Sequence, residues 1–275
     1  MMNVIPIDDP ADPRLTHYRN LRHADVHKRG PRFIAEGRMV TRRLLASDYP
    51  IESVLAEENR LADVAELDGT LTPVYLVKPD VIREVAGFAF HRGLLSCGKR
   101  LAFSRDVELA SIAVEQARVL ALISISDADN LGSLLRTAAA FGITNIALNR
   151  QTIDPLSRRA LRVSMGAALR MRYFDLAQPE AWFADNASRG NWQTVATTLS
   201  PDCIPIDQFQ RGEQPVMIVM GNEADGLPAS IQRTCAARVN IPMAPGVDSL
   251  NVAVAGAIML YELTRPAGMT RSERR

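Results

Sequence analysis

The sequence has few of the features that mark secreted, membrane-bound or disulfide-stabilised proteins. It holds only three cysteines in 275 residues, at Cys97, Cys203 and Cys235, and no Cys-x-x-Cys pair. This odd, widely spaced set predicts neither a disulfide framework nor a thiolate zinc site, and it fits a reducing compartment. The longest apolar run, from Val252 to Tyr261, is about half of the roughly 20 residues that a membrane-spanning helix needs. The N-terminus lacks the basic start and apolar stretch of a signal peptide, so we expect a soluble, cytoplasmic protein that does not bind membranes.

Several common binding and catalytic motifs are also missing. The chain has no G-x-G-x-x-G and no Walker lysine motif, which disfavours dinucleotide binding and a P-loop. It has no nucleophile elbow of a Ser-His-Asp hydrolase. His23 and His27 are spaced like a ligand pair on a helix, but no third ligand is near them, so no metal site is predicted. His91 is a weaker candidate, either for an RNA contact or for capping a turn.

The composition is that of a globular protein with one or two domains. Hydrophobic residues make up 47% of the chain and charged residues 23%, and the net charge is only +1. The charge is unevenly distributed, since nine Lys/Arg and two acidic residues lie between Arg14 and Arg43. Such a segment is typical either of polyanion binding or of a solvated surface, and charge alone does not separate the two.

The first 105 residues are predicted to form a compact α/β domain. Strands are expected at residues 32–37, 51–58, 73–78 and 92–99, and helices at 38–48 and 79–87. The second helix has Pro79 near its start and Gly87 at its end, as helices prefer. The polar, amphipathic segment 106–118 follows and is predicted to connect this domain to the next.

From residue 119 to 275 the pattern predicts a second domain, in which strands and helices alternate. Strands are expected at 119–126, 144–149, 171–174, 192–199, 215–221 and 238–243, and helices at 130–142, 154–169, 179–190, 227–236 and 249–265. Asp154 is the expected cap of the second of these helices, with Pro155 at its first position. The alternation, together with continuous apolar strands, predicts a parallel sheet covered on both faces.

Three strand ends of this domain carry polar or glycine-rich loops, at "SDADNLGSLLR", "GNEADGLP" and "APGVDSLN". Ligands of such sheets bind beyond the carboxyl ends of the strands, so these loops are the expected site. In the first loop a helix cap accounts for one polar residue but not for Asp127, Asp129 and Asn130 together. Arg136, further along, is either a surface residue or a partner for an anion.

The other two loops leave similar alternatives. Glu223 is either a solvated loop acid or a carboxylate that holds a cation or a hydroxyl. Asp248 or Ser249 is expected to cap the last helix, and an anionic group is favoured near that helix end. Asn251 lies one step too deep to be another cap, which favours a side-chain contact for it.

Together the three loops resemble the motifs of the SpoU/TrmH branch of the SPOUT methyltransferases. The first motif matches at Asn130, Gly132 and Arg136, and the second at Gly221, Glu223, Gly226 and Leu227. The third matches Ile-Pro-Met at residues 241–243 and Ser-Leu-Asn-Val at residues 249–252. The resemblance covers about residues 119–265, and residues 1–105 resemble more loosely an L30-like substrate-binding domain. Pro245 departs from the family pattern, which often has Gly at that position.

The resemblance implies a SPOUT-type parallel sheet with a C-terminal trefoil knot, a homodimer, and methyl transfer to a ribose 2′-hydroxyl of RNA. The RNA is expected to be rRNA, with tRNA as the alternative. S-adenosylmethionine is expected to bind in the knot, at positions matching Gly221, Ile241, Met243 and Leu250. A non-catalytic RNA-binding protein on the same fold is a further alternative, and a small-molecule methyltransferase would leave the basic N-terminal segment without a purpose.

The resemblance also implies roles for individual side chains. Arg136 is expected at the hydroxyl, with the rest of the polar wall formed by Asn130, Glu223, Ser249 and Asn251. An arginine keeps its proton in proteins, so Arg136 is interpreted as a phosphate-anchored polariser rather than a base, and the acceptor of the hydroxyl proton is left open. Phosphate contacts are expected from the N-terminal domain, at Arg32, Arg38, Arg42 and Arg43.

Overall fold

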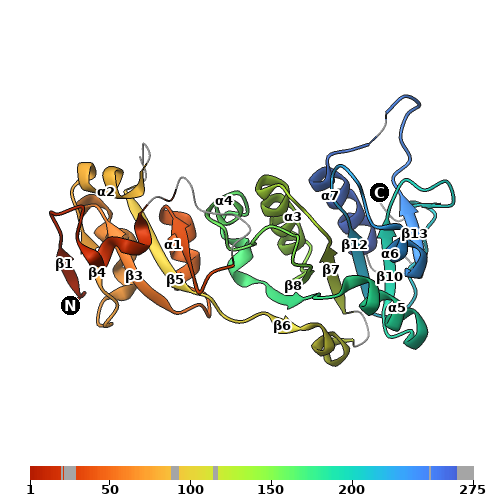
Figure 1. Ribbon diagram of the computed structural model, residues 1–275, viewed down its shortest axis with the longest axis horizontal. Helices are drawn as coiled ribbons and strands as arrows, with labels where there is room; N and C mark the ends of the chain where they lie inside the picture. Colours follow the sequence, from red (N-terminus) through yellow and green to blue (C-terminus); the bar gives the residue numbers. More distant parts are fainter. Residues whose placement is uncertain (20, 22–28, 88–92, 114–116, 248, 265–275) are drawn as a thin grey trace, which may run out of the picture. The chain divides into compact units, whose positions relative to one another are not determined.

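The computed structural model describes residues 1–19, 21, 29–87, 93–113, 117–247 and 249–264 (Figure 1). The chain forms two compact units. Unit 1 comprises residues 1–102 together with residues 154–170, and unit 2 comprises residues 103–153 together with the stretch from residue 171 onward. Residues 154–170, which the sequence pattern assigned to the second domain, therefore pack with the first hundred residues. The boundary near residue 105 and the L30-like character of the first domain stay predictions.

Unit 1 is built on a five-stranded sheet with the strand order β1-β4-β3-β5-β2. The strands are β1 (Val4–Pro6), β2 (Arg32–Glu36), β3 (Ile51–Ala56), β4 (Val74–Leu76) and β5 (Leu94–Lys99). β1, β4 and β3 are parallel, whereas β5 runs antiparallel to both β3 and β2. The sequence pattern predicted all of these strands except β1, which at three residues is too short to show an alternation.

The helices of unit 1 follow from simple sequence signals. They are η1 (Pro13–Tyr18), α1 (Arg38–Leu45), η3 (Glu58–Leu67) and α2 (Pro79–Ala86), where η marks a 3₁₀-helix. α2 buries one apolar face, including Val81, Ile82 and Val85, against the core of the unit. It ends at Gly87, which takes the left-handed conformation with φ of 76°.

Residues 154–170 form two short helices instead of the single predicted one. These are α4 (Arg158–Val163) and η5 (Ala167–Arg170). Ser157, and not Asp154, caps α4, because the Ser157 hydroxyl accepts from the Ala160 N–H. The break after α4 coincides with positive φ values at Met165 (53°) and Gly166 (82°), where a right-handed helix does not continue.

Ion pairs join this segment to the rest of unit 1. Asp154, which is 4% exposed, accepts two bonds from Arg100, at 3.0 Å from Nη1 and 2.5 Å from Nη2. Glu36, also 4% exposed, pairs with Arg158 and lies 3.7 Å from Arg162. Buried carboxylates need such partners, so these pairs define how the segment docks.

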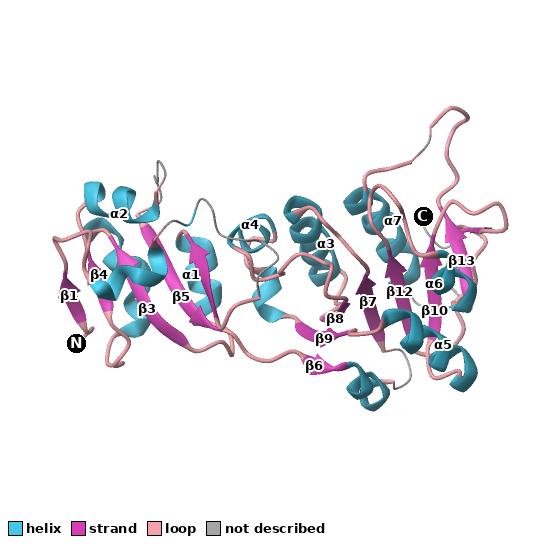
Figure 2. Cartoon of the chain, in the orientation of Figure 1, coloured by secondary structure: helices cyan, strands magenta, loops and turns pink. Residues whose placement is uncertain are grey.

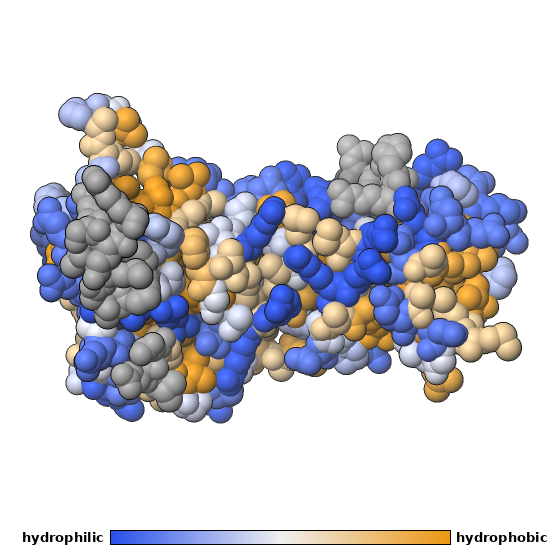
Figure 3. Space-filling view, turned by 180° about the vertical axis from the view of Figure 1, so that it is seen from behind, coloured by the Kyte–Doolittle hydropathy of each residue, from blue (hydrophilic) through white to orange (hydrophobic). Residues whose placement is uncertain are grey.

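The surface of unit 1 keeps some arginines largely solvated. The side chains of Arg38 and Arg42 on α1 are 62% and 52% exposed. On the face of the molecule shown in Figure 3, strongly hydrophilic side chains gather over unit 1, at the upper right of the view.

Unit 2 contains an eight-stranded sheet with the order β11-β13-β10-β12-β7-β8-β9-β6, in which every pair is parallel. The strands are β6 (Ser104–Arg105), β7 (Arg118–Leu122), β8 (Asn145–Leu148), β9 (Arg172–Asp175), β10 (Gln193–Thr197), β11 (Ile204–Pro205), β12 (Val216–Met220) and β13 (Ala237–Asn240). This confirms the predicted parallel sheet. The pattern missed β6 and β11, which have two residues each. The trefoil knot stays a prediction.

Helices cover both faces of this sheet (Figures 1 and 2). They are η4 (Asp106–Ile112), α3 (Ala128–Ala140), α5 (Pro179–Arg189), α6 (Ala229–Thr234) and α7 (Val252–Thr264). On one face, Leu109 of η4, Phe183 of α5 and Ile231 of α6 share a buried cluster with alternate residues of β7 and β12. On the other face, α7 packs closely against α3 and β12 at Gly256. A Cβ added to Gly256 would lie only 2.3 Å from the Leu134 side chain and 3.1 Å from the Met220 side chain.

β7 is shorter than its apolar run suggests. It ends at Leu122 rather than at residue 126, because Ser124 takes a positive φ of 60° and turns the chain. Ile123 and Ile125 are nevertheless buried, so the apolar run reports burial and not strand length. In the part of the chain that the structure describes, no helix has the length and apolar character to cross a membrane.

Candidate active site

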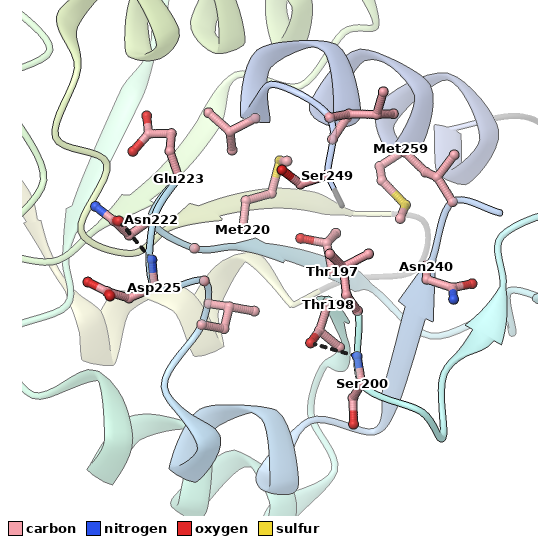
Figure 4. A pocket seen from close by; sticks show the side chains of 18 of the residues that line it. Thr197, Thr198, Ser200, Met220, Asn222, Glu223, Asp225, Asn240, Ser249 and Met259 are labelled. Atoms are coloured by element: carbon pink, nitrogen blue, oxygen red, sulfur yellow. Dashed lines mark hydrogen bonds between the residues drawn. The ribbon is translucent and has the colours of Figure 1, made fainter. Parts of the chain in front are cut away.

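The three predicted loops meet at the carboxyl edge of the sheet of unit 2. A cavity of about 640 Å³ opens there, of a size that suits a small-molecule ligand. Figure 4 shows Asn222 and Glu223 on one side of this cavity and Thr198, Ser200 and Asn240 on the other. Its lining comprises residues 197–200, 220–227, Gln232, Asn240, Ile241, Met243, Ser249, Leu250, Val252, Ala255 and Met259.

All four predicted cofactor positions line this cavity, namely Gly221, Ile241, Met243 and Leu250. Gly221 is the most constrained of them. A Cβ at this position would lie 2.4 Å from the backbone of both Gly226 and Leu227. Only glycine therefore allows the loop after β12 to fold back on itself and form this wall of the cavity.

The departure at Pro245 has a simple structural outcome. Pro245 and Gly246 are the central residues of a turn that is closed by a 3.3 Å bond from the Val247 N–H to the Ala244 carbonyl. Gly246 has a φ of 86°, as the third residue of a type II turn requires, and proline favours the position before it. Asp248, one of the two expected caps, lies outside the described residues.

A chain of amide side chains links α7, α3 and the loop after β12. Asn251 Nδ2 donates to Asn130 Oδ1 at 2.9 Å, and Asn130 Nδ2 donates to Glu223 Oε1 at 2.8 Å. The direction of this chain is fixed, because Asn251 Oδ1 is already occupied by the N–H groups of Ala253 and Val254. The arrangement therefore aims an amide donor at the Glu223 carboxylate.

The same bonds correct the prediction for Asn251. The sequence pattern predicts Asp248 or Ser249 as the cap of the last helix and a side-chain contact for Asn251. The helix begins at Val252, and the Asn251 side chain accepts from the Ala253 N–H at 2.9 Å, so Asn251 is the cap. An asparagine has both an acceptor and a donor, and it therefore caps α7 and contacts Asn130 at once. Ser249 is exposed and lines the cavity.

The loops that carry Asn130 and Glu223 are held by local side-chain bonds. Asp127 caps α3 by accepting from the N–H groups of Asp129 and Asn130. Ser126 donates to Glu223 Oε2 at 3.4 Å, so each oxygen of this exposed carboxylate has a donor. Asn222 Oδ1 accepts from the N–H groups that follow Glu223 and shapes that turn.

The sequence pattern missed the far side of the cavity. Thr198 donates to Gln232 Oε1 at 2.9 Å, and Gln232 Nε2 donates to the Leu227 carbonyl at 2.7 Å. Asn240 also lines the cavity, and its Oδ1 is buried with no hydrogen-bond partner among the described residues. A sequence signal existed for two of these residues, since Thr198 directly follows β10 and Asn240 is the last residue of β13. Gln232 lies within α6, where no strand end marks it.

Arg136 does not join the polar wall within this chain. It is exposed on α3, and in the described part of the chain it makes no hydrogen bond or ion pair. Six residues separate it from Asn130, which places the two on different faces of the helix at 3.6 residues per turn. Asn130 contacts Glu223 and Asn251 instead of the arginine.

The four arginines expected to contact phosphate all have partners within unit 1. Arg32 pairs with Glu52 through two bonds of 2.5 and 2.8 Å. Arg38 lies 2.8 Å from Asp63, and Arg43 donates to the Met165 carbonyl at 2.6 Å. Arg42 has the loosest contact, 3.8 Å from Glu66 with both side chains about half exposed. His23, His27 and His91 lie outside the described residues.

Comparison with known proteins gives the family of this fold and cavity. The model of the SpoU rRNA methylase family matches residues 117–261. A protein named uncharacterized tRNA/rRNA methyltransferase from Mycobacterium tuberculosis is 33% identical over 277 residues, which cover 96% of this chain and 93% of that protein. The 23S rRNA (guanosine-2′-O-)-methyltransferase of Acinetobacter baylyi is 30% identical over 76% of this chain and 85% of its own length.

Solved structures that align with more than nine tenths of this chain share its fold. An AdoMet-bound rRNA methyltransferase from Sinorhizobium meliloti aligns with a TM-score of 0.78 and 27% identity, covering 94% of this chain and 97% of that one. The SpoU methyltransferase AviRb from Streptomyces viridochromogenes has the same fold, with a TM-score of 0.76 at 22% identity. Its two structures cover 92% of this chain, and this chain covers 96% and 98% of theirs. The motifs, the parallel sheet and these matches agree, and the chain belongs to the SpoU rRNA methylase family.

Proposed function

We propose that this chain transfers the methyl group of S-adenosylmethionine to a ribose 2′-hydroxyl of RNA, with rRNA the favoured substrate. One observation carries the proposal: the hydrogen bonds from Asn251 to Asn130 and from Asn130 to Glu223 end at a cavity that all four predicted cofactor residues line. The similarity to a 23S rRNA 2′-O-methyltransferase supports the ribose hydroxyl and rRNA. A tRNA substrate is the nearest alternative.

The residues of the cavity fit the proposed cofactor. The backbone of Gly221 approaches that of Gly226 closely enough to exclude any side chain, which leaves peptide groups to line that wall. The unpartnered Oδ1 of Asn240 offers an acceptor for an amino or hydroxyl group. When bound, the sulfonium supplies a methyl group that is already activated for transfer. The protein then has to orient the hydroxyl, exclude water and remove a proton.

The polar wall suits the orienting part of that task. Glu223 is exposed, and its two oxygens are held by Asn130 and Ser126, so its carboxylate keeps a fixed direction. Ser249 presents a hydroxyl to the same cavity. In this proposal these groups hold the ribose near the cofactor, and the acceptor of the 2′-hydroxyl proton stays open.

Arg136 keeps its proposed role as a phosphate-anchored polariser, acting at the site of a homodimer. Its guanidinium is exposed and, among the described residues, has no competing carboxylate. Arg136→Ala and Arg136→Lys are both expected to reduce methylation by about 100-fold or more while leaving S-adenosylmethionine affinity within about twofold. Near-normal turnover in the lysine variant would mean that the fork of donors is not needed.

The RNA surface is proposed on unit 1. α4 and η5 add arginines to those of α1 in the same unit. Arg158 and Arg162 are engaged by Glu36, whereas Arg170 is exposed. Arg42 is the residue of α1 whose ion pair is loosest. Arg42→Glu is expected to weaken RNA binding in a salt-dependent way, whereas Arg83→Glu, at another exposed arginine of unit 1 on α2, serves as the matched control. Equal losses in both variants would exclude a defined phosphate contact at Arg42.

Two measurements test the function itself. Calorimetry with S-adenosylmethionine separates the methyltransferase from a non-catalytic RNA-binding protein, since the latter is expected to bind no cofactor. Mapping of 2′-O-methyl positions in total RNA, from cells with and without this gene, then identifies the substrate. Loss of a mark from rRNA supports the proposal, loss from tRNA supports the alternative, and an unchanged map contradicts both.

A further inference from the structure

A buried asparagine outside the three motifs holds the first loop of the site. Asn149 directly follows β8 and is 3% exposed. Its Oδ1 accepts from the Ser124 N–H at 2.8 Å, and its Nδ2 donates to the Ser124 hydroxyl at 3.0 Å. Thr152 adds to the same contact, because its N–H donates to Asn149 Oδ1 at 3.1 Å.

The residue held in this way has an unfavourable backbone conformation. Ser124 has a φ of 60°, a region that glycine adopts freely and that serine rarely adopts. Non-glycine residues persist there only where the surroundings fix them, and such positions gather at functional sites. Asn149 supplies that fixation, since it engages both the N–H and the hydroxyl of Ser124.

The carbonyl of Ser124 connects this turn to the loop that carries Glu223. The Ser124 carbonyl accepts from Asn222 Nδ2 at 2.8 Å, and the same amide donates to Ser126 at 3.3 Å. Asn222 Oδ1 in turn accepts from the Ala224 N–H at 2.7 Å and so shapes the turn that carries Glu223. A continuous set of hydrogen bonds therefore runs from Asn149 through Ser124 and Asn222 to the polar wall.

A second contact reinforces this set from the same loop. Thr152 is 1% exposed, donates to the Leu122 carbonyl at 2.9 Å, and accepts from the Ile125 N–H at 3.3 Å. The residues before and after Ser124 are thus held by the loop after β8. The residues of this loop are not part of the cavity lining, and its hydrogen bonds to the first loop of the site go to residues 122–125.

We infer that Asn149 is a positioning residue of this methyltransferase: it locks the left-handed turn at Ser124 and thereby fixes Asn222 and the Glu223 carboxylate. The inference rests on the proposed role of Glu223 in the site. It assigns to Asn149 an effect mainly on the rate of methyl transfer, because its hydrogen bonds lead through Ser124 to Asn222 and Glu223 rather than to the four predicted cofactor positions.

A double-mutant cycle with the full-length protein tests this inference. Asn149→Ala is expected to lower kcat by about 10- to 100-fold through misplacement of the wall, with KM for S-adenosylmethionine within about twofold. Added to Glu223→Gln, the same change is expected to cost little more, because both act through one carboxylate. Fully additive losses would overturn the inference. Full activity of Glu223→Gln alone would instead remove the proposed role of Glu223.

A rescue experiment and a matched control separate positioning from general stability. Ser124→Gly adopts the left-handed turn without help, so it is expected to restore much of the kcat lost in Asn149→Ala. Asn186→Ala removes another buried asparagine of unit 2, whose side chain bonds to the Trp192 backbone, and is expected to lower thermal stability without changing kcat. No recovery with Ser124→Gly, or an equal loss of kcat in Asn186→Ala, would overturn the inference.

Discussion

Polar side chains serve different purposes in the two units. In unit 1, carboxylates that are about 4% exposed pair with arginines, and these pairs join residues 154–170 to the first hundred residues. In unit 2, neutral amides form a directed chain that ends on the exposed carboxylate of Glu223. Buried charge has to be matched within the protein, whereas an exposed and oriented group stays available to a ligand. The exposure of a carboxylate, rather than its charge, thus distinguishes the ion pairs that hold unit 1 together from the candidate site of unit 2.

The largest effect is expected from breaking a buried pair of unit 1. Asp154→Asn removes the charge opposite Arg100 and should lower the free energy of unfolding by about 3 kcal/mol, since a buried unpaired charge remains. Asp185→Asn, which breaks the exposed pair with Arg189, should cost about 0.5 kcal/mol or less. Urea unfolding of the two variants measures the difference, and similar losses would contradict the contrast between buried and exposed pairs.

A comparable effect on the site is expected from Gly221→Ala. The added Cβ would meet backbone at 2.4 Å, which cannot move aside like a side chain, so the wall of the cavity must shift. We expect S-adenosylmethionine affinity to fall by about 100-fold, as misplacement by about 1 Å can do. Gly142→Ala is the control for a glycine with open space at its Cβ, although its φ of 73° adds strain. Unchanged calorimetric affinity in Gly221→Ala would show that this wall does not contact the cofactor.

A smaller effect separates the two polar residues at the start of α7. Asn251→Ala removes a helix cap and should cost about 1 kcal/mol of stability, besides slowing methylation. Ser249→Ala should leave stability unchanged, because Ser249 is exposed and caps nothing in the described chain. Thermal unfolding of the two variants measures the difference. Equal melting temperatures would contradict the assignment of Asn251, rather than Ser249, as the helix cap.

The smallest effect is expected on the alkylation rates of the three cysteines, which report how deeply each unit buries its thiols. Burial raises the pKa of Cys97 in unit 1 to about 12 and that of Cys235 in unit 2 to about 11. Burial also raises the pKa of Cys203, and this side chain is only half-buried. Raised pKa values mean that the thiols stay almost entirely protonated at pH 8, which slows their alkylation. Alkylation of the native protein at pH 8 should therefore modify Cys203 first and Cys97 last, and rapid labelling of Cys97 would contradict the burial of unit 1's core.

Most elements of the fold could be predicted because their signals are local. Pro79 and Gly87 bracket α2, and the apolar runs of β7 and β12 indicate strands buried on both faces. β1, β6 and β11 were missed because two or three residues hold no pattern. The end of β7 was misplaced because Ser124 turns the chain while its neighbours stay buried, and burial alone does not distinguish a strand from a buried turn.

The candidate site was predictable to the extent that it follows strand ends and family motifs. Gly221, Leu250 and Ser249 all line the cavity as expected. Gln232 and Asn149 were not found, because each acts through a distant partner: Gln232 bonds to Thr198, 34 residues away, and Asn149 to Ser124, 25 residues away. No local pattern encodes such pairs.

The sequence by itself determined the parallel α/β class, the three loops at one edge of the sheet and the residue types that they carry. The tertiary structure decided which of those residues meet. It joined Asn251 to Asn130 across 121 positions, left Arg136 outside that chain, and gave the predicted phosphate contacts protein partners. The physical reason is that alternation and capping are local properties of a chain, whereas hydrogen bonds and ion pairs between distant residues depend on how the packed elements bring them together.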